Sequence, residues 1–104
     1  MSYLVISTTY RVRPEHRTAY LDAMRRVREN ALDLGAIEYR LFEDDVQSGR
    51  FTEQLVYDGW MQWERARTTP PASDMAAIFD KMEEWVEGGT TEVQFMKSHL
   101  GRFA

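Results

Sequence analysis

Apolar positions along the chain follow two different periods, and the change of period divides the sequence into elements. Residues 3–12 alternate between apolar and polar side chains and are rich in β-branched and aromatic types, which predicts a β-strand. After Pro14 the apolar residues recur at steps of three and four as far as Leu34, the pattern of a long amphipathic helix. Gly35 ends this helix, because glycine is favoured just beyond the last helical turn.

The remainder of the chain continues with more strands and helices. Residues 44–49 are rich in turn-forming types and join two strands into a hairpin. Pro70 and Pro71 separate two helices, because proline interrupts helical hydrogen bonding. The elements predicted here are strands over 36–43, 51–58 and 91–99, a short helix that holds Trp60 and Trp63, and a helix that begins at Ser73 or Asp74 and ends at Gly88.

The predicted order is β-α-β-β-α-β, which indicates an α+β protein with the ferredoxin-like arrangement. In that arrangement four antiparallel strands form one sheet, and the helices cover one of its faces. A chain of 104 residues has room for one hydrophobic core. We therefore expect residues 1–104 to form a single domain.

Alternation along the strands assigns each side chain to one face of the sheet. The more apolar set should meet the helices: Leu4, Ile6, Tyr10, Val12, Ile37, Tyr39, Leu41, Phe51, Leu55, Tyr57, Val93 and Phe95. The opposite face mixes apolar and polar residues, such as Val5, Thr9 and Phe42. Such a face suits packing against a second copy of the sheet, which predicts a homodimer. The alternative is a half-solvated sheet in a monomer.

Charge and residue types exclude several classes of protein. Thirteen basic and seventeen acidic residues give a net charge of −4, which argues against nucleic-acid binding. The chain has no cysteine, and its two histidines, His16 and His99, are far apart, so we expect no metal site. No apolar run approaches the roughly 18 residues of a membrane span, and the start lacks a basic signal region. The protein is expected to be cytoplasmic.

Aromatic residues gather on the predicted helix-facing side. The candidate ligand-binding residues are Tyr10, Tyr20, Met24, Tyr39, Tyr57, Trp60, Trp63, Met82 and Trp85. Glu53 shares this face and is the candidate catalytic residue, provided that burial raises its pKa enough for it to act as a base near neutral pH. An aromatic cavity with a few polar groups is typical of a small-molecule pocket. The alternative is that these aromatics only fill the core, with their hydroxyls at the rim.

Four segments carry a resemblance to a known family: "YLVISTTYRV", "PEHRTAYLDAMRRVRENALDLGA", "IEYRLFEDD" and "GRFTEQLVYDGW". The shared features are Gly35-Ala36, Phe42 to Asp44, Gly49 to Glu53 and Trp60. Over residues 3–69 the chain resembles the antibiotic-biosynthesis-monooxygenase-like proteins of the dimeric α+β barrel superfamily. Within that family it is most similar to a branch found as stand-alone proteins and as the soluble C-terminal domain of some major-facilitator exporters.

The resemblance implies a ferredoxin-like protomer that dimerises through its sheet and holds a hydrophobic pocket between sheet and helices. Enzymes of this superfamily oxidise aromatic polyketides without a cofactor, degrade haem or act on quinols. The family commonly places a histidine a few residues after the tryptophan that opens the helix, where this chain has Trp63, with Arg67 as the next candidate. Haem-degrading members carry an asparagine near the end of the first strand, where Thr9 and Tyr10 stand here. These differences argue against haem degradation.

Three functions remain open from the sequence. The first is a small-molecule-binding, cofactor-independent monooxygenase that acts on an aromatic or polycyclic substrate. In it Glu53 would accept a proton, Tyr10, Tyr39 and Tyr57 would donate hydrogen bonds, and Met24, Trp60, Trp63 and Trp85 would form the walls. The second is a non-catalytic module that binds a small hydrophobic ligand, or an exporter-associated accessory domain. The third is a structural dimer without a ligand.

Overall fold

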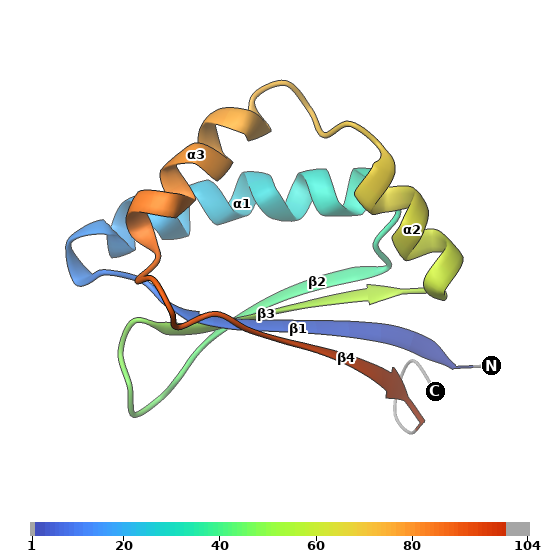
Figure 1. Cartoon of the computed structure of the whole chain (residues 1–104), viewed down its shortest axis with the longest axis horizontal. Coiled ribbons are helices and arrows are strands. Elements are labelled where there is room, and N and C mark those ends of the chain that lie inside the picture. Colours follow the sequence, from blue (N-terminus) through green and yellow to red (C-terminus); the bar gives the residue numbers. More distant parts are fainter. Residues whose placement is uncertain (1, 100–104) are drawn as a thin grey trace.

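The computed structural model describes residues 2–99 and shows a four-stranded antiparallel sheet with three α-helices on one face (Figure 1). The elements are β1 (Tyr3–Arg11), the 3-10 turn η1 (Pro14–His16), α1 (Arg17–Asp33), β2 (Glu38–Glu43), β3 (Arg50–Tyr57), α2 (Trp60–Thr68), α3 (Met75–Trp85) and β4 (Glu92–Ser98). The strand order is β2-β3-β1-β4. The predicted α+β, ferredoxin-like arrangement is confirmed. No helix within the described residues is long and apolar enough to cross a membrane.

The end of α1 shows why this helix stops where the sequence predicts. Gly35 has a φ of 109°, a left-handed conformation that side chains with a Cβ rarely adopt. The amide of Gly35 donates to the Leu32 carbonyl (3.1 Å), and the amide of Ala36 donates to the Ala31 carbonyl (3.0 Å). These bonds use carbonyls that the helix would otherwise leave unpaired, and they turn the chain directly into β2.

The loop between β2 and β3 is held by one carboxylate and one close backbone contact. Oδ1 of Asp44 accepts hydrogen bonds from the amides of Val46 (2.8 Å) and Gln47 (2.7 Å). Gly49 has a φ of 87°, and a Cβ added to it would lie 3.0 Å from the carbonyl oxygen of Val12. Glycine is therefore required at this position for two reasons, its left-handed backbone and its close approach to the end of β1.

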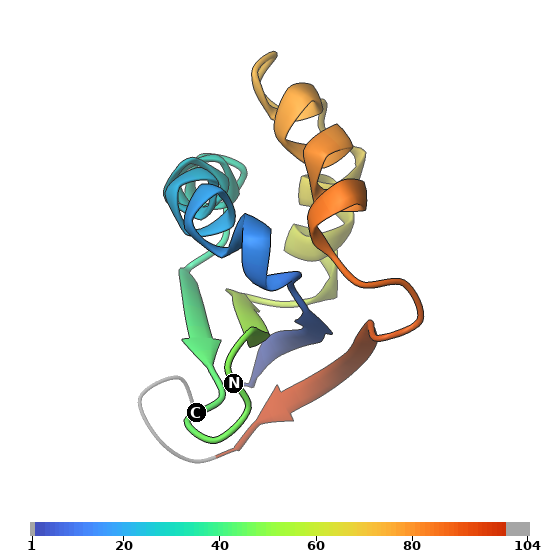
Figure 2. The same ribbon diagram turned by 90° about the vertical axis from the view of Figure 1, so that its left-hand side faces the viewer.

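The strand register confirms most of the predicted faces. Tyr10 pairs with Phe51, Leu4 with Tyr57 and Tyr39 with Leu55, all on the side of the helices. Three residues of the apolar face are less covered than expected: Ile37, Val93 and Phe95 are 42%, 52% and 49% exposed. The last two lie on β4, an edge strand that pairs only with β1 and is poorly covered by the helices (Figure 2). Alternation identifies the face of a residue but not how far the helices extend over it.

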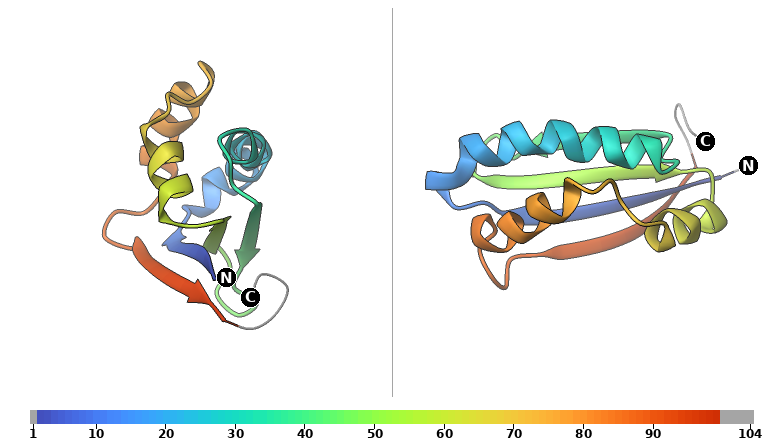
Figure 3. Two further views of the ribbon diagram at one scale, coloured as in Figure 1. Left: turned by 90° about the vertical axis from the view of Figure 1, so that its right-hand side faces the viewer. Right: turned by 90° about the horizontal axis from the view of Figure 1, so that it is seen from above.

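Two buried clusters fill the space between sheet and helices. One contains Tyr10, Val12, Tyr20, Met24, Tyr39, Phe51 and Trp85, and the other contains Leu4, Ile6, Ala36, Tyr57 and Ala66. They lie toward opposite ends of β1 and β3, and Leu55 packs against both. Seen from above, α1 runs along one side of β3 while α3 and α2 follow the other (Figure 3). This arrangement places the middle of β3 between the helices.

The opposite face of the sheet has the mixed character that the alternation predicts. The hydroxyls of Thr9 and Thr52 are hydrogen-bonded at 2.9 Å, and Arg40 pairs with Glu38. Oε2 of Glu38 is buried and has no hydrogen-bond partner. Phe42 is 47% exposed on this face. The homodimer through this face stays a prediction.

Candidate functional site

A cavity of about 250 Å³ lies above the middle of β3, between α1 on one side and α2 and α3 on the other. Its lining is mainly apolar and comes from five elements. The residues of the lining are Met24, Val27, Asn30, Ala31, Leu34, Tyr39, Glu53, Leu55, Tyr57, Trp63, Ala66, Arg67, Phe79 and Met82. The cavity opens to solvent on the side of Arg67 and Phe79. A concave, mainly apolar space with few polar groups is the usual form of a small-molecule site.

Glu53 contributes the carboxyl group of this cavity. It lies on β3, between Leu41 of β2 and Thr8 of β1, so the sheet surrounds it on both sides. Its side chain is half-buried and forms part of the cavity lining. Burial raises the pKa of Glu53 above its ordinary value of 4.5, while hydrogen bonds from Tyr39 and Tyr10 act in the opposite direction. A carboxyl group of raised pKa in an apolar cavity is suited to proton transfer near neutral pH.

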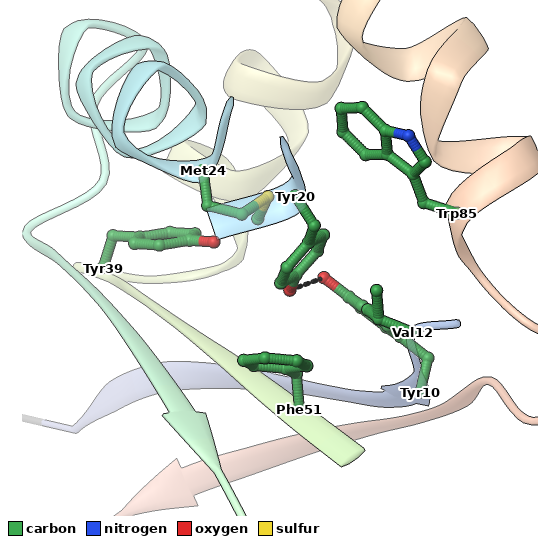
Figure 4. Packing of buried hydrophobic residues seen from close by; sticks show 7 residues of the cluster. All are labelled: Tyr10, Val12, Tyr20, Met24, Tyr39, Phe51 and Trp85. Carbon is green, nitrogen blue, oxygen red and sulfur yellow. Dashed lines mark hydrogen bonds between the residues drawn. The ribbon is translucent and has the colours of Figure 1, made fainter. Parts of the chain in front are cut away.

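Tyrosine hydroxyls surround this carboxyl group. The hydroxyl of Tyr39 donates to Oε1 of Glu53 (2.8 Å), and the hydroxyls of Tyr10 and Tyr20 are hydrogen-bonded to each other at 2.6 Å (Figure 4). Burial raises the pKa of all three tyrosines, and the charge of Glu53 raises each further. These hydroxyls therefore stay protonated at neutral pH and act as hydrogen-bond donors beside Glu53.

Apart from Trp60, the structure places the predicted site residues in two positions. Glu53, Met24, Tyr39, Tyr57, Trp63 and Met82 line the cavity. Tyr10, Tyr20 and Trp85 lie beside it in the first buried cluster, where Tyr20 is completely enclosed and packs on Phe51 with ring centroids 4.7 Å apart. The structure thus brings most of the predicted residues together around one space, with three of them behind its wall.

The two neighbouring tryptophans of α2 have different environments. Trp63 lines the cavity and packs on Tyr57 with ring centroids 5.7 Å apart. Trp60 is 57% exposed and stacks on Phe95 of β4, with centroids 5.5 Å apart and an interplanar angle of 23°. One helical turn of α2 points Trp63 toward the sheet and leaves Trp60 at the outer side. Only Trp63 is positioned to contact a molecule in the cavity.

Polar residues that the sequence did not single out as lining include Asn30 and Arg67. Asn30 is buried, and its Oδ1 accepts a hydrogen bond from the amide of Ala72 (3.2 Å), which ties the loop between α2 and α3 to α1. Arg67 is exposed and pairs with Glu64 through Nη2 (2.8 Å). A sequence signal for Asn30 exists, because it lies one position before Ala31 of the apolar stripe. Arg67 carries a different signal, because the family resemblance names it as a candidate for the position of the family's histidine.

Within residues 2–99 no group of three or more histidine, cysteine, aspartate or glutamate side chains lies close enough to hold a metal ion. The cavity lining offers a proton acceptor, Glu53, and tyrosine hydroxyls around it as hydrogen-bond donors. This combination supports the removal of a proton from a bound molecule and the stabilisation of the resulting anion.

Comparison with known proteins gives a fold but no close relative. No protein-family model and no curated protein matches the sequence. Among solved structures, SnoaB, a cofactor-independent oxygenase from Streptomyces nogalater, is similar with a TM-score of 0.77 and 10% identity over 95% of each chain. An antibiotic biosynthesis monooxygenase has a TM-score of 0.74 and 15% identity, covering 93% of this chain and 99% of its own. This chain has the fold of antibiotic biosynthesis monooxygenase-like proteins.

The same fold also occurs in a conserved protein from Methanosarcina mazei Go1, with a TM-score of 0.75 and 15% identity over 92% of each chain. Identities this low establish the shared fold and nothing about substrate. The more specific resemblance to exporter-linked domains stays a prediction. The function must therefore be argued from the cavity.

Proposed function

We propose that the protein is a cofactor-independent monooxygenase that oxidises an aromatic phenol or enol bound in the cavity above β3. The observation that carries this proposal is the position of Glu53: its carboxyl group, with a raised pKa, lines an apolar cavity and is held by Tyr39. The name of SnoaB adds support from a protein with the same fold.

The first chemical step is the removal of the substrate's hydroxyl proton by Glu53. Phenols have a pKa near 10, and a carboxylate whose pKa is raised above 4.5 is a better base for them than an ordinary one. The resulting anion is electron-rich and transfers electrons to dioxygen. Overall, a phenol and dioxygen become a quinone and water: one oxygen atom enters the ring, and the second leaves with the ring hydrogen and the hydroxyl hydrogen.

Tyrosine hydroxyls stabilise the anion in this mechanism. Tyr39 and Tyr57 line the cavity, and burial raises the pKa of each, so both remain protonated while the substrate is ionised. Tyr10 and Tyr20 lie behind them and pass no atom to the substrate, but Tyr10 also hydrogen-bonds Glu53. Apolar walls that include Met24 and Trp63 surround the ligand on the inner side of the cavity, and an apolar surrounding strengthens electrostatic interactions.

Oxygen consumption tests the proposal. The purified protein, without added cofactor, is mixed with naphthols, and the uptake of oxygen is followed with an oxygen electrode. The reaction is repeated with isotopically labelled dioxygen, and incorporation of the label into the product is measured. We expect uptake that the Glu53→Gln variant lowers by about 100-fold or more, the range for loss of general base catalysis. The matched control, Glu92→Gln, changes an exposed glutamate of β4 and should react at the wild-type rate.

Tight binding of these phenols without any oxygen uptake by the wild type would contradict the enzymatic proposal. That result would instead support the non-catalytic ligand-binding module.

A further inference from the structure

The lining of the cavity above β3 contains two charged side chains in different places. Glu53 is held by Tyr39 of the first buried cluster, whereas Arg67 directly follows Ala66 of the second cluster. Among the described residues of the lining, Arg67 is the one with a positive charge. The cavity therefore has a carboxyl group on its floor and a guanidinium group elsewhere in its wall.

Arg67 lies at the open side of the cavity. It belongs to the last turn of α2, and within the described part of the chain it and Phe79 are the exposed residues of the lining. A negative group bound at this mouth keeps part of its contact with water, so it avoids most of the cost of burying a charge. The adjacent guanidinium group then stabilises it.

The contacts of Arg67 leave it able to bind a ligand. Its Nε (3.2 Å) and Nη2 (2.8 Å) both donate to the same oxygen atom, Oε2 of Glu64. The two side chains are about half exposed, and an exposed ion pair of this kind contributes little. Nη1 has no hydrogen-bond partner within residues 2–99. Because the planar guanidinium group matches the geometry of a carboxylate, Arg67 has donors available for one.

Asn30 supplies a second donor in the lining. Its side chain is 7% exposed, and its Oδ1 accepts the hydrogen bond from the amide of Ala72. This bond fixes the orientation of the side-chain amide, and no acceptor among the described residues pairs with its Nδ2. Ala72 lies in the loop that follows α2, so Asn30 is on the side of the cavity where α2 ends.

We propose that the ligand of this cavity is an aromatic hydroxy acid, whose hydroxyl group reaches Glu53 and whose carboxylate binds Arg67 at the mouth, with Asn30 as a second donor. The inference rests on the proposed function for the location of the site and for the role of Glu53. It adds the chemical class of the substrate. The reverse orientation would place the carboxylate beside Glu53, where two negative charges repel each other.

Binding of three related molecules tests the inference without turnover. The protein is titrated under nitrogen at pH 7 with 6-hydroxy-2-naphthoic acid, with its methyl ester and with 2-naphthol, by isothermal calorimetry. The acid and the ester have similar shapes and differ in the negative charge. We expect the wild type to bind the acid about fivefold or more tightly than the ester, because hydrogen bonds to a charged group are the stronger ones. Added salt should reduce this preference.

Substitutions on α2 identify the group that recognises the acid. Arg67→Gln should weaken binding of the acid by about fivefold to tenfold and leave the ester unchanged. Glu64→Gln removes the competing carboxylate and should strengthen binding of the acid by about twofold or more. The matched control is Arg65→Gln, which makes the same change in net charge at an exposed position outside the lining. It should keep the wild-type affinities.

The contribution of Asn30 is tested by Asn30→Asp. This variant keeps an oxygen atom for the Ala72 amide and replaces the Nδ2 donor with a second oxygen. It should weaken binding of the acid by about fivefold or more relative to the ester, and equal weakening of both would show that Asn30 does not contact the carboxylate. If Asn30→Asp does not fold by circular dichroism, the comparison of Arg67→Gln with Arg65→Gln still decides the inference.

A wild type that binds the acid no more tightly than the ester would overturn the inference and leave the proposed function standing. Equal losses in Arg67→Gln and Arg65→Gln would also overturn it, because the preference would then come from net charge alone. If none of the three molecules binds, the inference and the proposed function both fail. A preference for the acid that depends on Arg67, without later oxygen uptake, would support the ligand class and contradict only the enzymatic proposal.

Discussion

The hydroxyl of Tyr39 donates a 2.8 Å hydrogen bond to the carboxyl group of Glu53 on the neighbouring strand. The two residues are diagonal neighbours, because Tyr39 pairs with Leu55 and Leu41 pairs with Glu53. The register of β2 against β3 thus brings a proton donor to the one carboxyl group of the cavity lining.

Removal of this hydrogen bond should change the pH dependence of the reaction. The Tyr39 hydroxyl lowers the pKa of Glu53 against the larger effect of burial. In Tyr39→Phe the pKa of Glu53 should rise further, so the acidic limb of the rate profile should move to higher pH. Rates of oxygen uptake between pH 5 and pH 9 measure the shift. The control variant, Tyr3→Phe on β1, lies outside the cavity lining and should keep the wild-type pH profile. If the acidic limb of the Tyr39→Phe profile stays at the wild-type pH, the assignment of this limb to Glu53 is wrong.

Glu53 should also make the protein less stable as the pH rises. Its pKa in the folded protein is above the ordinary value of 4.5, so stability that is present below pH 4.5 is lost as the pH increases through the folded-state pKa. Each tenfold difference in the acid constant corresponds to about 1.4 kcal/mol. The Glu53→Gln variant lacks this loss. The difference in the free energy of unfolding between the variant and the wild type, measured in urea, should therefore shift in favour of the variant as the pH rises from 4 toward neutral. A constant difference across this range would show that Glu53 keeps an ordinary pKa.

Glu43 should have the opposite pH dependence. It accepts hydrogen bonds from Arg17 (2.5 and 3.0 Å) and from the amide of Gly49 (2.8 Å), which lower its pKa from 4.5 to about 2. The stability that it contributes is present above pH 4.5 and lost as the pH falls toward 2. Glu43→Gln should cost about 1 kcal/mol or less at pH 7, since the pair is partly exposed, and nothing near pH 2.

Urea unfolding at several pH values measures that loss, and Glu87→Gln is its matched control. Glu87 pairs with Arg11 at 3.9 Å and is half-exposed, so its replacement should have no measurable effect. Equal losses in the two variants would mean that the contacts of Glu43 add nothing beyond an ordinary surface charge.

Ligand binding should be reported by Trp63 and not by Trp60. Trp63 lines the cavity, whereas Trp60 stacks on Phe95 outside its lining. We expect a bound naphthol to quench tryptophan fluorescence in the wild type and in Trp60→Phe, and to quench much less in Trp63→Phe. The unchanged signal of Trp60→Phe is the control. Equal quenching in Trp63→Phe would place the ligand elsewhere.

The exposed sheet face should mediate dimerisation. Phe42 lies on this face and is 47% exposed, and Phe79 is 46% exposed at the rim of the cavity on α3. Two such sheets packed together would cover Phe42 but not Phe79. Sedimentation should therefore show a dimer for the wild type and for Phe79→Glu, and a monomer for Phe42→Glu. A monomeric wild type would leave the sheet half-solvated, the alternative that the sequence allows.

The sequence by itself determined the secondary structure and the two faces of the sheet. Alternation in 3–12 and the three-four period before Gly35 depend on local backbone geometry, so they are readable without any tertiary information. The same alternation put Tyr10, Tyr39 and Glu53 on the helix-facing side. It also allowed two outcomes for those residues, a ligand cavity or a filled core.

Only the tertiary structure shows that a cavity is left there, because an empty volume depends on the distance between helices. Helix α1 lies far enough from α2 and α3 to leave a cavity beside Glu53. Tyr10 and Tyr20 lie in the buried cluster next to that cavity and are not part of its lining. The exposure of Val93 and Phe95 is also tertiary, since it depends on where the helices end over β4. Periodicity specifies the direction of a side chain, whereas the packing of distant elements specifies what it meets there.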